Sequence, residues 1–454
     1  MDYLKKYLHV LIIPFAFFTV WLWSFPMYGP LLANIDNNPY NLFMFFLVSH
    51  ALGLLVYGYV MDFLEKRQRE NKLELYITFI ISVIISLLTI IFPFLTSNPM
   101  RAAIIITGFF SGFLVVYFLY NMSISKTADV RGGILGFIFF LAGIFFIVFL
   151  VVPYGIWMYF VNALFLLAPF ILVKIGIKKK QNISSVEIGE KSNTYWFSLI
   201  LLVILFYSGS GLMYNLLYGR IMTVEGGFFD IGFLFYPLVV LPAGILADRF
   251  GRKILINIGL SFSGLGFLLL LFRVFSTLSL ILLQSAFAVM DIFLFLTLMD
   301  WSDYFNNRKV LSIGLFINVI VIYISGMPFL ISNLPTYISP EFWPAVGLVM
   351  VLLIIPLLYF AKETYLIKQS KDILPNKQTK QMEFDELCSI YSISPREKEI
   401  IGLLLEGKST KVISDLLSIS YNTLKTHLRN IYRKTKTKSQ NELIVLFWEK
   451  VEKK

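Results

Sequence analysis

The sequence has one cysteine and three histidines among its 454 residues, and only 15% of its residues are charged. One cysteine excludes a disulfide within the chain and a cysteine-rich metal site. Three histidines are too few for a histidine-based metal cluster. Soluble domains carry roughly a quarter charged residues. The shortage of charge therefore excludes an ordinary soluble enzyme and a disordered chain.

Long apolar segments fill most of the chain, which is 57% hydrophobic and 17% aromatic. A helix that crosses a bilayer needs about 20 mostly apolar residues. Twelve stretches qualify, and a break at Pro153-Tyr154-Gly155 separates the fifth from the sixth. The spans lie near 8–25, 40–62, 74–95, 101–120, 133–153, 155–174, 195–215, 228–247, 254–272, 277–300, 309–331 and 340–361. They predict an all-α, twelve-helix membrane domain over residues 1–361.

Lysine and arginine are distributed unequally between the loops on the two sides of these spans. One set of loops carries eighteen of them, whereas the other set carries only Arg101, Arg220 and Arg273. Positively charged loops stay in the cytoplasm. We therefore expect a multi-pass protein of the bacterial cytoplasmic membrane with both termini on the cytoplasmic side.

Two loops on the positive side repeat the same pattern. The chain reads Gly58-Tyr-Val-Met-Asp62-Phe63-Leu-Glu65-Lys-Arg after the second span and Gly244-Ile-Leu-Ala-Asp248-Arg249-Phe-Gly-Arg252-Lys after the eighth. The two copies hold the same place in successive runs of six spans. Two related six-helix halves are a common plan of transporters.

The second loop resembles the signature loop of the major facilitator superfamily, G-x-x-x-D-R-x-G-R-R/K, at every fixed position. The first copy has Phe63 and Glu65 where the motif has Arg and Gly. The resemblance implies a fold of two six-helix halves and a charged latch between helix ends on the cytoplasmic side. Its members here are Asp62, Asp248, Arg249 and Arg252. The erosion of the first copy weakens the prediction of active transport.

Ionisable and polar residues inside membrane spans are functional candidates by default. Asp291 lies near the middle of the tenth span, where it contacts a ligand or proton or else pairs with a neighbouring helix. Further ligand-binding candidates are His50, Asn162 and Asn215, although a structural role for His50 is favoured. We expect Asp300, at the cytoplasmic end of its helix, to be solvated. Aromatic pairs such as Phe139-Phe140 and Phe145-Phe146 are more typical of lipid-facing or packing residues than of a cavity.

The pattern after Ser394 is that of a small helical domain. Ser394-Pro395-Arg396-Glu397 is a capping box with proline in the first turn. Apolar residues at helical spacing then predict helices over about 395–406, 410–417, 421–434 and 439–448.

This segment resembles the LuxR-type (GerE-type) helix-turn-helix domain over about 55 residues. The matching positions are Ser394-Pro-Arg-Glu397, Glu399, Glu406-Gly407, Ser409, Lys411, Ile413, Leu416, Ile419-Ser420, Thr423, Lys425, His427, Asn430-Ile-Tyr-Arg-Lys434 and Ser439. The resemblance implies that the third helix enters the major groove of DNA.

The resemblance also implies roles for single residues of that helix. Lys425, Thr426 and Arg429 would contact base edges. Lys411, Asn422, Thr423, His427 and Arg433 would contact the DNA backbone. Thr435, Lys436 and Thr437 stand where the family usually has Leu, Gly and an apolar residue, next to the helix that usually forms the dimer. A homodimer on DNA is expected, and these departures bear on its geometry.

These patterns predict a membrane-embedded transcription regulator. A membrane sensor (1–361) would bind an unknown small molecule, a cytoplasmic linker (362–389) would follow, and a helix-turn-helix domain (390–454) would bind promoter DNA. The alternative is an active transporter that carries a regulatory tail. We expect neither an enzyme nor a cofactor or metal, because the sequence shows no catalytic carboxylate pair, metal-ligand spacing or nucleophile motif.

Overall fold

The chain divides into two compact units, Met1–Ser370 and Lys371–Lys454, each with its own hydrophobic core. The computed structural model describes residues 12–27, 30–33, 35, 39–66, 71–124, 130–152, 154–172, 199–212, 234–272, 276–305, 307–326, 342–360, 384–385, 387–405, 410–417, 419–437, 439, 442–443 and 446–447. All regular elements in this part of the chain are helices, as predicted.

Each of the twelve predicted spans corresponds to a helix of the first unit. The first six are α2 (Ile13–Ser24), α4 (Pro39–Lys66), α5 (Asn71–Ile91), α6 (Ser97–Ser123), α7 (Arg131–Val151) and α8 (Trp157–Leu172), with short α3 (Pro30–Ala33) and η2 (Phe92–Phe94) between them. The next six are Leu199–Leu212, α10 (Phe235–Phe250), α11 (Lys253–Leu271), α12 (Ser276–Tyr304), α13 (Lys309–Gly326) and α14 (Phe342–Phe360). The predicted break is confirmed, because α7 ends at Val151 and α8 begins at Trp157.

Helix α5 shows how these helices suit a bilayer. Its buried Thr78, Ser82 and Thr89 hydroxyls each donate to the carbonyl four residues earlier. Ser86 instead donates to the Ala163 carbonyl of α8, at 3.2 Å. The opposite face is apolar and exposed, as at Leu87. Satisfied polar groups thus face the bundle, and hydrocarbon faces outward, as a lipid environment requires.

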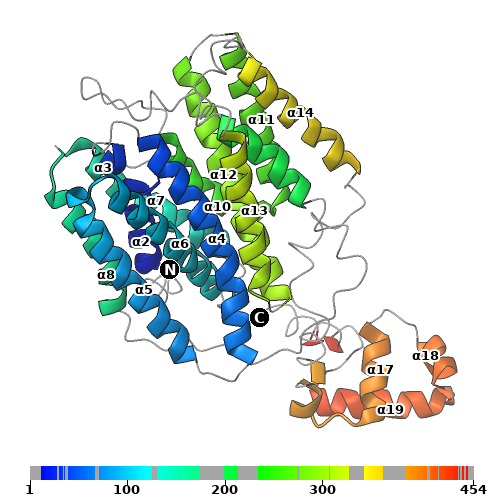
Figure 1. Ribbon diagram of the computed structural model, residues 1–454. Coiled ribbons are helices and arrows are strands. Elements are labelled where there is room, and N and C mark those ends of the chain that lie inside the picture. Colours follow the sequence, from blue (N-terminus) through cyan, green and yellow to red (C-terminus); the bar gives the residue numbers. More distant parts are fainter. Residues whose placement is uncertain are drawn as a thin grey trace. The chain divides into compact units, whose positions relative to one another are not determined.

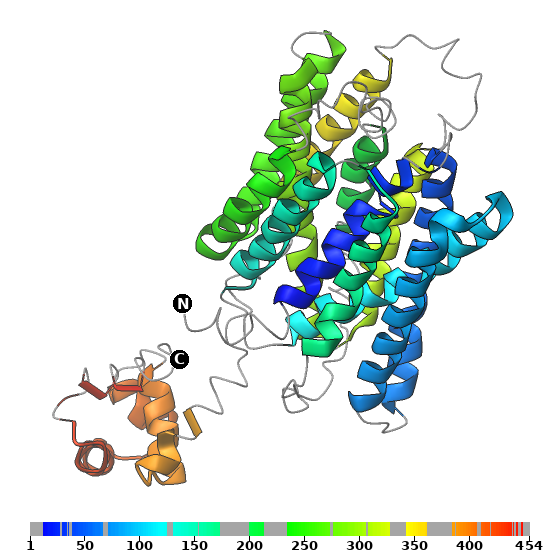
Figure 2. The ribbon, with the colours of Figure 1, turned by 90° about the vertical axis from the view of Figure 1, so that its left-hand side faces the viewer.

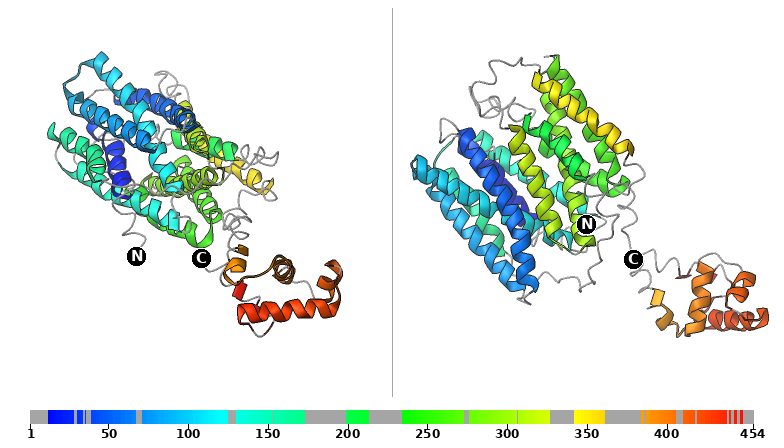
Figure 3. Two further views of the ribbon diagram at one scale, coloured as in Figure 1. Left: turned by 90° about the horizontal axis from the view of Figure 1, so that it is seen from below. Right: turned by 45° about the vertical axis from the view of Figure 1, so that its right-hand side comes forward.

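The two halves of the first unit meet along two helix pairs, α4 with α13 and α7 with α10. Figure 1 shows α2 to α8 gathered on one side of this unit and α11 to α14 on the other. The bundle can be followed from other directions in Figures 2 and 3. Glycine lets α7 and α10 approach closely, since a Cβ on Gly244 would lie 2.0 Å from the Gly132 carbonyl oxygen.

The second unit contains α17 (Pro395–Leu405), α18 (Thr410–Leu416) and α19 (Tyr421–Thr435), coloured orange to red in Figure 3. The predicted capping box is present: the Ser394 amide donates to Glu397 Oε2 at 2.8 Å, and the Glu397 amide donates to Ser394 Oγ at 3.4 Å. Of the fourth predicted helix, Leu443 and Phe447 are described, and both are buried in the core of this unit.

The predicted linker, residues 362–389, extends past the start of the folded second unit. Leu387 and Cys388 are buried in the core of the second unit, together with Ile400 and Phe447. The folded domain therefore begins before the first residue that the capping-box motif identifies. Residues 361–383 lie outside the described residues.

Candidate functional site

Helix α19 has one buried face and one exposed face. Leu424, Leu428 and Ile431 are buried in the core of the second unit. Exposed on the opposite face are Asn422, Lys425, Thr426, Arg429 and Arg433. Their spacing of three or four residues places them along one stripe of the helix. Lys425, Thr426 and Arg429, the residues predicted to contact base edges, thus share one accessible surface.

The start of α19 is fixed by its cap. Ser420 Oγ accepts the Thr423 amide at 3.1 Å and lies 2.8 Å from the Thr423 hydroxyl. The predicted backbone-contact residue Thr423 thus also belongs to the cap. The Lys425 ammonium lies 4.9 Å from the ring centre of Tyr421, a cation–π contact. Of the other predicted contacts, His427 is half-buried, and the side chain of Lys411 lies outside the described residues.

The loops that follow α4 and α10 make similar contacts across the two halves. Asp248, at the end of α10, accepts the amides of Gly132 and Gly133 at 2.9 and 2.7 Å, where α7 begins. Asp62, at the end of α4, pairs with Lys309 Nζ at 2.7 Å, where α13 begins. In both copies, the motif aspartate holds the first turn of a helix from the other half. We call these the two signature contacts.

The two arginines of the second loop differ in exposure and in their contacts. Arg249 is exposed, whereas Arg252 donates to Asp300 Oδ2 at 2.5 Å. Asp300 also accepts Arg131 Nη1 at 2.6 Å, and Arg131 is almost fully buried. The expectation that Asp300 is solvated is therefore wrong. The prediction missed Arg131, whose signal was a lone arginine directly before the paired glycines of α7.

A further ion pair joins the halves on the α13 side. Arg308 Nη1 lies 2.9 Å from Glu74 Oε1, and the Arg308 guanidinium lies 4.3 Å from the ring centre of Tyr120. The Tyr57 hydroxyl also donates to Glu74. Sequence patterns gave no reason to select Glu74 or Arg308, because their partners lie more than two hundred positions away in the chain.

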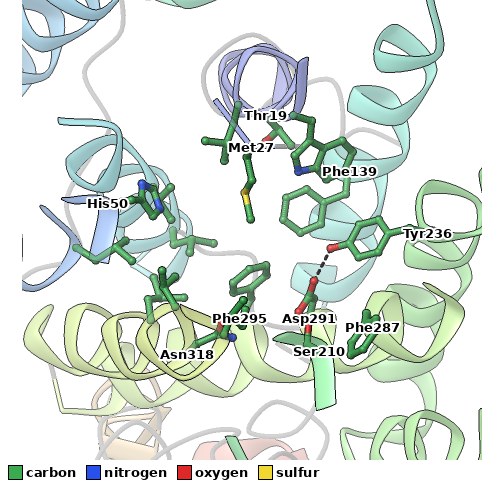
Figure 4. A pocket seen from close by; sticks show the side chains of 18 of the residues that line it. Thr19, Met27, His50, Phe139, Ser210, Tyr236, Phe287, Asp291, Phe295 and Asn318 are labelled. Atoms are coloured by element: carbon green, nitrogen blue, oxygen red, sulfur yellow. Dashed lines mark hydrogen bonds between the residues drawn. The ribbon is translucent and has the colours of Figure 1, made fainter. Parts of the chain in front are cut away.

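The first unit encloses a central cavity of about 210 Å³. Residues from both halves line it, and most of them are apolar or aromatic. The polar exceptions are Thr19, His50, Tyr207, Ser210, Tyr236, Gln284, Asp291 and Asn318. Figure 4 shows His50 on one side of the cavity and Asp291 on the other.

Asp291 is the one carboxylate among the described lining residues. Its Oδ1 accepts the Tyr207 hydroxyl and its Oδ2 the Tyr236 hydroxyl, each at 2.6 Å. His50 Nδ1 lies 2.7 Å from Ser111 Oγ. Within the described residues, buried Gln284 Nε2 has no hydrogen-bond partner. The described lining of the cavity thus offers one carboxyl group and one amide donor without a partner, in largely apolar surroundings.

The structure separates the predicted ligand candidates. Asp291 and His50 line the cavity, but Asn162 lies against α2, where its Nδ2 is 3.5 Å from the Trp21 carbonyl oxygen. Its position does not support the predicted ligand role. Asn215 lies outside the described residues. Phe139 and Phe146 line the cavity, which is the less favoured of the two roles that the sequence suggested for these aromatic pairs.

Comparison with known proteins identifies the second unit. Residues 391–447 match the family model of the bacterial regulatory proteins of the LuxR family. The monoamine regulon transcriptional regulator of Klebsiella aerogenes is 44% identical over 66 residues, which are 14% of this chain and 28% of that protein. The regulator MalT of Vibrio campbellii is 30% identical over 89 residues, 16% of this chain and 10% of that protein. The chain thus spans less than a third of either relative.

The solved structures that resemble the chain cover its first unit. The proton:xylose symporter XylE, a major facilitator superfamily protein, superposes with a TM-score of 0.59 at 14% identity, over 79% of this chain and 96% of that one. At this identity the similarity shows the fold alone. The chain therefore joins helices with the major facilitator fold to a C-terminal unit that matches the LuxR family of bacterial regulatory proteins.

Proposed function

We propose that this protein is a transcription regulator of the bacterial cytoplasmic membrane, in which the major facilitator-like unit binds a small molecule and the LuxR-type unit binds promoter DNA. The observation that carries the proposal is the exposed stripe of α19, where Lys425, Thr426 and Arg429 lie together beside a capped N-terminus. These side chains provide donors for base edges, and Asn422 and Arg433 provide donors for phosphates.

The ligand acts through a difference in affinity. A ligand shifts the DNA-binding unit only if it binds two states of the membrane unit unequally. The signature contacts are candidates for the element that differs, since in each of them an aspartate of one half contacts the first turn of a helix of the other half. The change in the DNA-binding unit is then exposure of α19, or pairing of two chains on DNA half-sites about one turn of the double helix apart.

Transcript profiling tests the regulator. Cells with the intact protein are compared with cells carrying Lys425→Ala/Arg429→Ala, which leaves the membrane unit unaltered. We expect a small set of transcripts to change. Lys398→Ala is the control, because it removes a positive charge from the same unit but outside α19, where Lys398 pairs with Asp385 at 2.7 Å. Unchanged transcripts in the double variant would contradict the proposal.

A second candidate is a transporter with a regulatory tail. It is favoured by Asp62, which keeps a cross-half partner in Lys309 although its loop has lost the motif arginine. Uptake by membrane vesicles that contain the protein distinguishes the two. Accumulation of a compound that also changes the transcripts would show that both activities are present in one chain.

A further inference from the structure

Among its described lining residues, the cavity of the first unit has one carboxyl group, that of Asp291, and no lysine or arginine. A phenolic hydroxyl donates to each oxygen of Asp291 at 2.6 Å, within the range of about 2.5–2.7 Å typical of hydrogen bonds to an ionised carboxylate. A protonated carboxyl would instead present a donor of its own to one of these hydroxyls. As assigned, both oxygens of Asp291 accept a hydrogen bond, the arrangement that an ionised carboxylate requires.

Burial of such an anion is unfavourable. Removing a carboxylate from water costs several kcal/mol unless a counter-charge and hydrogen bonds compensate for it. Tyr207 and Tyr236 supply hydrogen bonds but no charge. The remaining titratable lining group, His50, lies on the other side of the cavity and is bonded to Ser111. The cavity is therefore complementary to a cation that comes from outside the chain.

The walls of the cavity favour an organic cation over a metal ion. The Trp23 ring centre lies 5.5 Å from that of Tyr236 and 6.0 Å from that of Phe139. Phe139 in turn lies 5.7 Å from Phe295. Aromatic faces attract ammonium groups and bury apolar surface. By contrast, the described residues contain no group of three acidic, histidine or cysteine side chains suited to a metal, and 210 Å³ is far larger than a bare ion needs.

We propose that the central cavity binds an organic monocation, a protonated amine on an aromatic or apolar body, with its ammonium group against Asp291 and its body against the wall formed by Trp23, Phe139 and Phe295. This inference rests on the proposed function and specifies the ligand class that the regulator senses. Removal of the Asp291 charge should lower the affinity for cations and leave the affinity for neutral ligands of the same shape unchanged.

Three probes with one ring and different charges test this assignment. Phenethylamine, 2-phenylethanol and phenylacetate are cationic, neutral and anionic near pH 7. Equilibrium binding is measured on the full chain in lipid nanodiscs. We expect the amine to bind at least about tenfold more tightly than the other two, the factor that corresponds to one favourable interaction of about 1.4 kcal/mol.

Asp291→Asn provides the second comparison. It keeps the side-chain shape, removes the charge, and should lower amine affinity at least about tenfold while leaving the alcohol within about twofold. Asp385→Asn is the matched control, because it makes the same change in the second unit, outside the cavity. If Asp291→Asn does not fold, the three probes on the unaltered protein decide the matter alone.

The proposal is overturned if the amine does not bind, if the alcohol or carboxylate binds as well as the amine, or if a folded Asp291→Asn protein keeps the amine affinity. These outcomes differ from failure of the proposed function. If the protein shows no preference for cations but transcripts still depend on Lys425 and Arg429, only the proposed ligand class is wrong. If the protein prefers cations but transcripts do not depend on these residues, the proposed regulatory function is wrong and the cation site remains.

Discussion

Two exposed arginines on α19, one turn apart, are expected to act on DNA in different ways. Arg429 lies beside Lys425 and Thr426 in the base-reading group, whereas Arg433 lies nearer the C-terminal end of the helix. Arg429→Ala should weaken binding to the operator by roughly 1–3 kcal/mol and relax specificity at one base pair. Arg433→Ala should weaken binding to all sequences similarly and reduce the salt dependence by about one phosphate contact.

Electrophoretic mobility shifts at two salt concentrations, with operator and scrambled DNA, measure both effects. If Arg429→Ala leaves operator affinity unchanged, α19 does not read bases through this residue. Equal losses of affinity for operator and scrambled DNA would indicate that Arg429 contacts the DNA backbone.

Glu397 makes the stability of the second unit depend on pH. Burial alone would raise the pKa of this carboxyl, but hydrogen bonds from Lys434 Nζ at 2.5 Å and from the Ser394 amide outweigh burial and hold the pKa below its ordinary value. The folded state therefore binds the proton less tightly than the unfolded state. The resulting stabilisation is complete above the unfolded pKa, about 4.3, and is lost as pH falls through the lower folded pKa.

Glu397→Gln should accordingly lower the melting temperature of a fragment covering residues 371–454 at pH 7, and the difference from the unaltered fragment should shrink below about pH 4. Glu399→Gln is the control, since Glu399 is 53% exposed and pairs with Arg396, three residues away. An exposed pair of this kind contributes little. A constant difference across pH for Glu397→Gln would contradict the assignment.

Single residues also show the limit of sequence reasoning. The intramembrane position of Asp291 was enough to select it, because a charge in a span requires an explanation. The same rule selected Asn162, which lies against the α2 backbone instead. Asp300 was expected in solvent because it lies at a helix end, yet Arg131 and Arg252 both donate to it. Residue type indicates that a partner is required, whereas the identity of that partner depends on contacts between distant helices.

At the level of whole elements, the end of α19 shows why the LuxR family usually has glycine at the position of Lys436. Lys436 has a φ of 57° and is left-handed, and its amide closes the helix onto the Tyr432 carbonyl. Glycine adopts this conformation without the steric cost that other residues bear. Lys436→Gly should therefore stabilise the second unit by about 1 kcal/mol.

Chemical unfolding of the same fragment, residues 371–454, tests this expectation. Lys425→Gly is the matched control, since it places glycine in the helix interior, where it should destabilise by about 1 kcal/mol. If both variants were destabilised equally, the left-handed end of α19 would carry no steric cost.

The close approach of α7 and α10 has a similar test in the membrane unit. A Cβ at Gly244 would lie 2.0 Å from the Gly132 carbonyl oxygen, and backbone on both sides leaves no flexible group to move. Gly244→Ala should therefore separate the helices, weaken the Asp248 contact with α7 and destabilise the unit by roughly 1–3 kcal/mol. Thermal unfolding of the protein in detergent provides the measurement.

Gly264→Ala is the corresponding control in α11. Its Cβ would meet only Val351 Cγ1, at 3.8 Å, an ordinary van der Waals contact. This variant should melt at or above the temperature of the unaltered protein, because alanine is the better helix former. Equal destabilisation of the two variants would show that the loss at Gly244 does not arise from the α7–α10 contact.

Elements were more predictable from the sequence than the contacts between them. Every predicted span corresponds to a helix because the length of an apolar run is a local property. The capping box at Ser394 was likewise complete within four residues. The linker boundary was wrong, since Leu387 and Cys388 precede the motif and their burial depends on Phe447, about sixty residues later.

For the molecule as a whole, the charge distribution predicts its orientation in the membrane. Lys5 belongs to the positively charged side and Arg101 to the opposite side. A membrane-impermeant maleimide added to intact cells should label Arg101→Cys and should label Lys5→Cys only after permeabilisation. The native thiol should give little background, because burial raises the pKa of Cys388 to about 11 and only the thiolate reacts. Labelling of Lys5→Cys in intact cells would reverse the orientation.

The amino-acid composition predicts the division into two units, whereas it does not predict the cavity. A DNA-binding domain of about 55 residues has its own sequence motif, whereas the cavity is lined by α2, α4, α6, α7, Leu199–Leu212, α10, α12 and α13. No short stretch of sequence contains that arrangement. Trp23, Tyr236 and Asp291 are brought together only when the halves pack.

The signature contacts bear on how such chains have diverged. The first loop lost its motif arginine at Phe63, a side chain that is 54% exposed, and Arg249, at the same position of the intact loop, is also exposed. What both loops kept is the glycine–aspartate pair that touches the other half. The first loop thus departs from the motif at an exposed position and agrees with it at the positions that touch the other half. In this chain the cross-half contact of Asp62 therefore does not require the motif arginine, and the loss of that arginine alone does not show that the joint between the halves is lost.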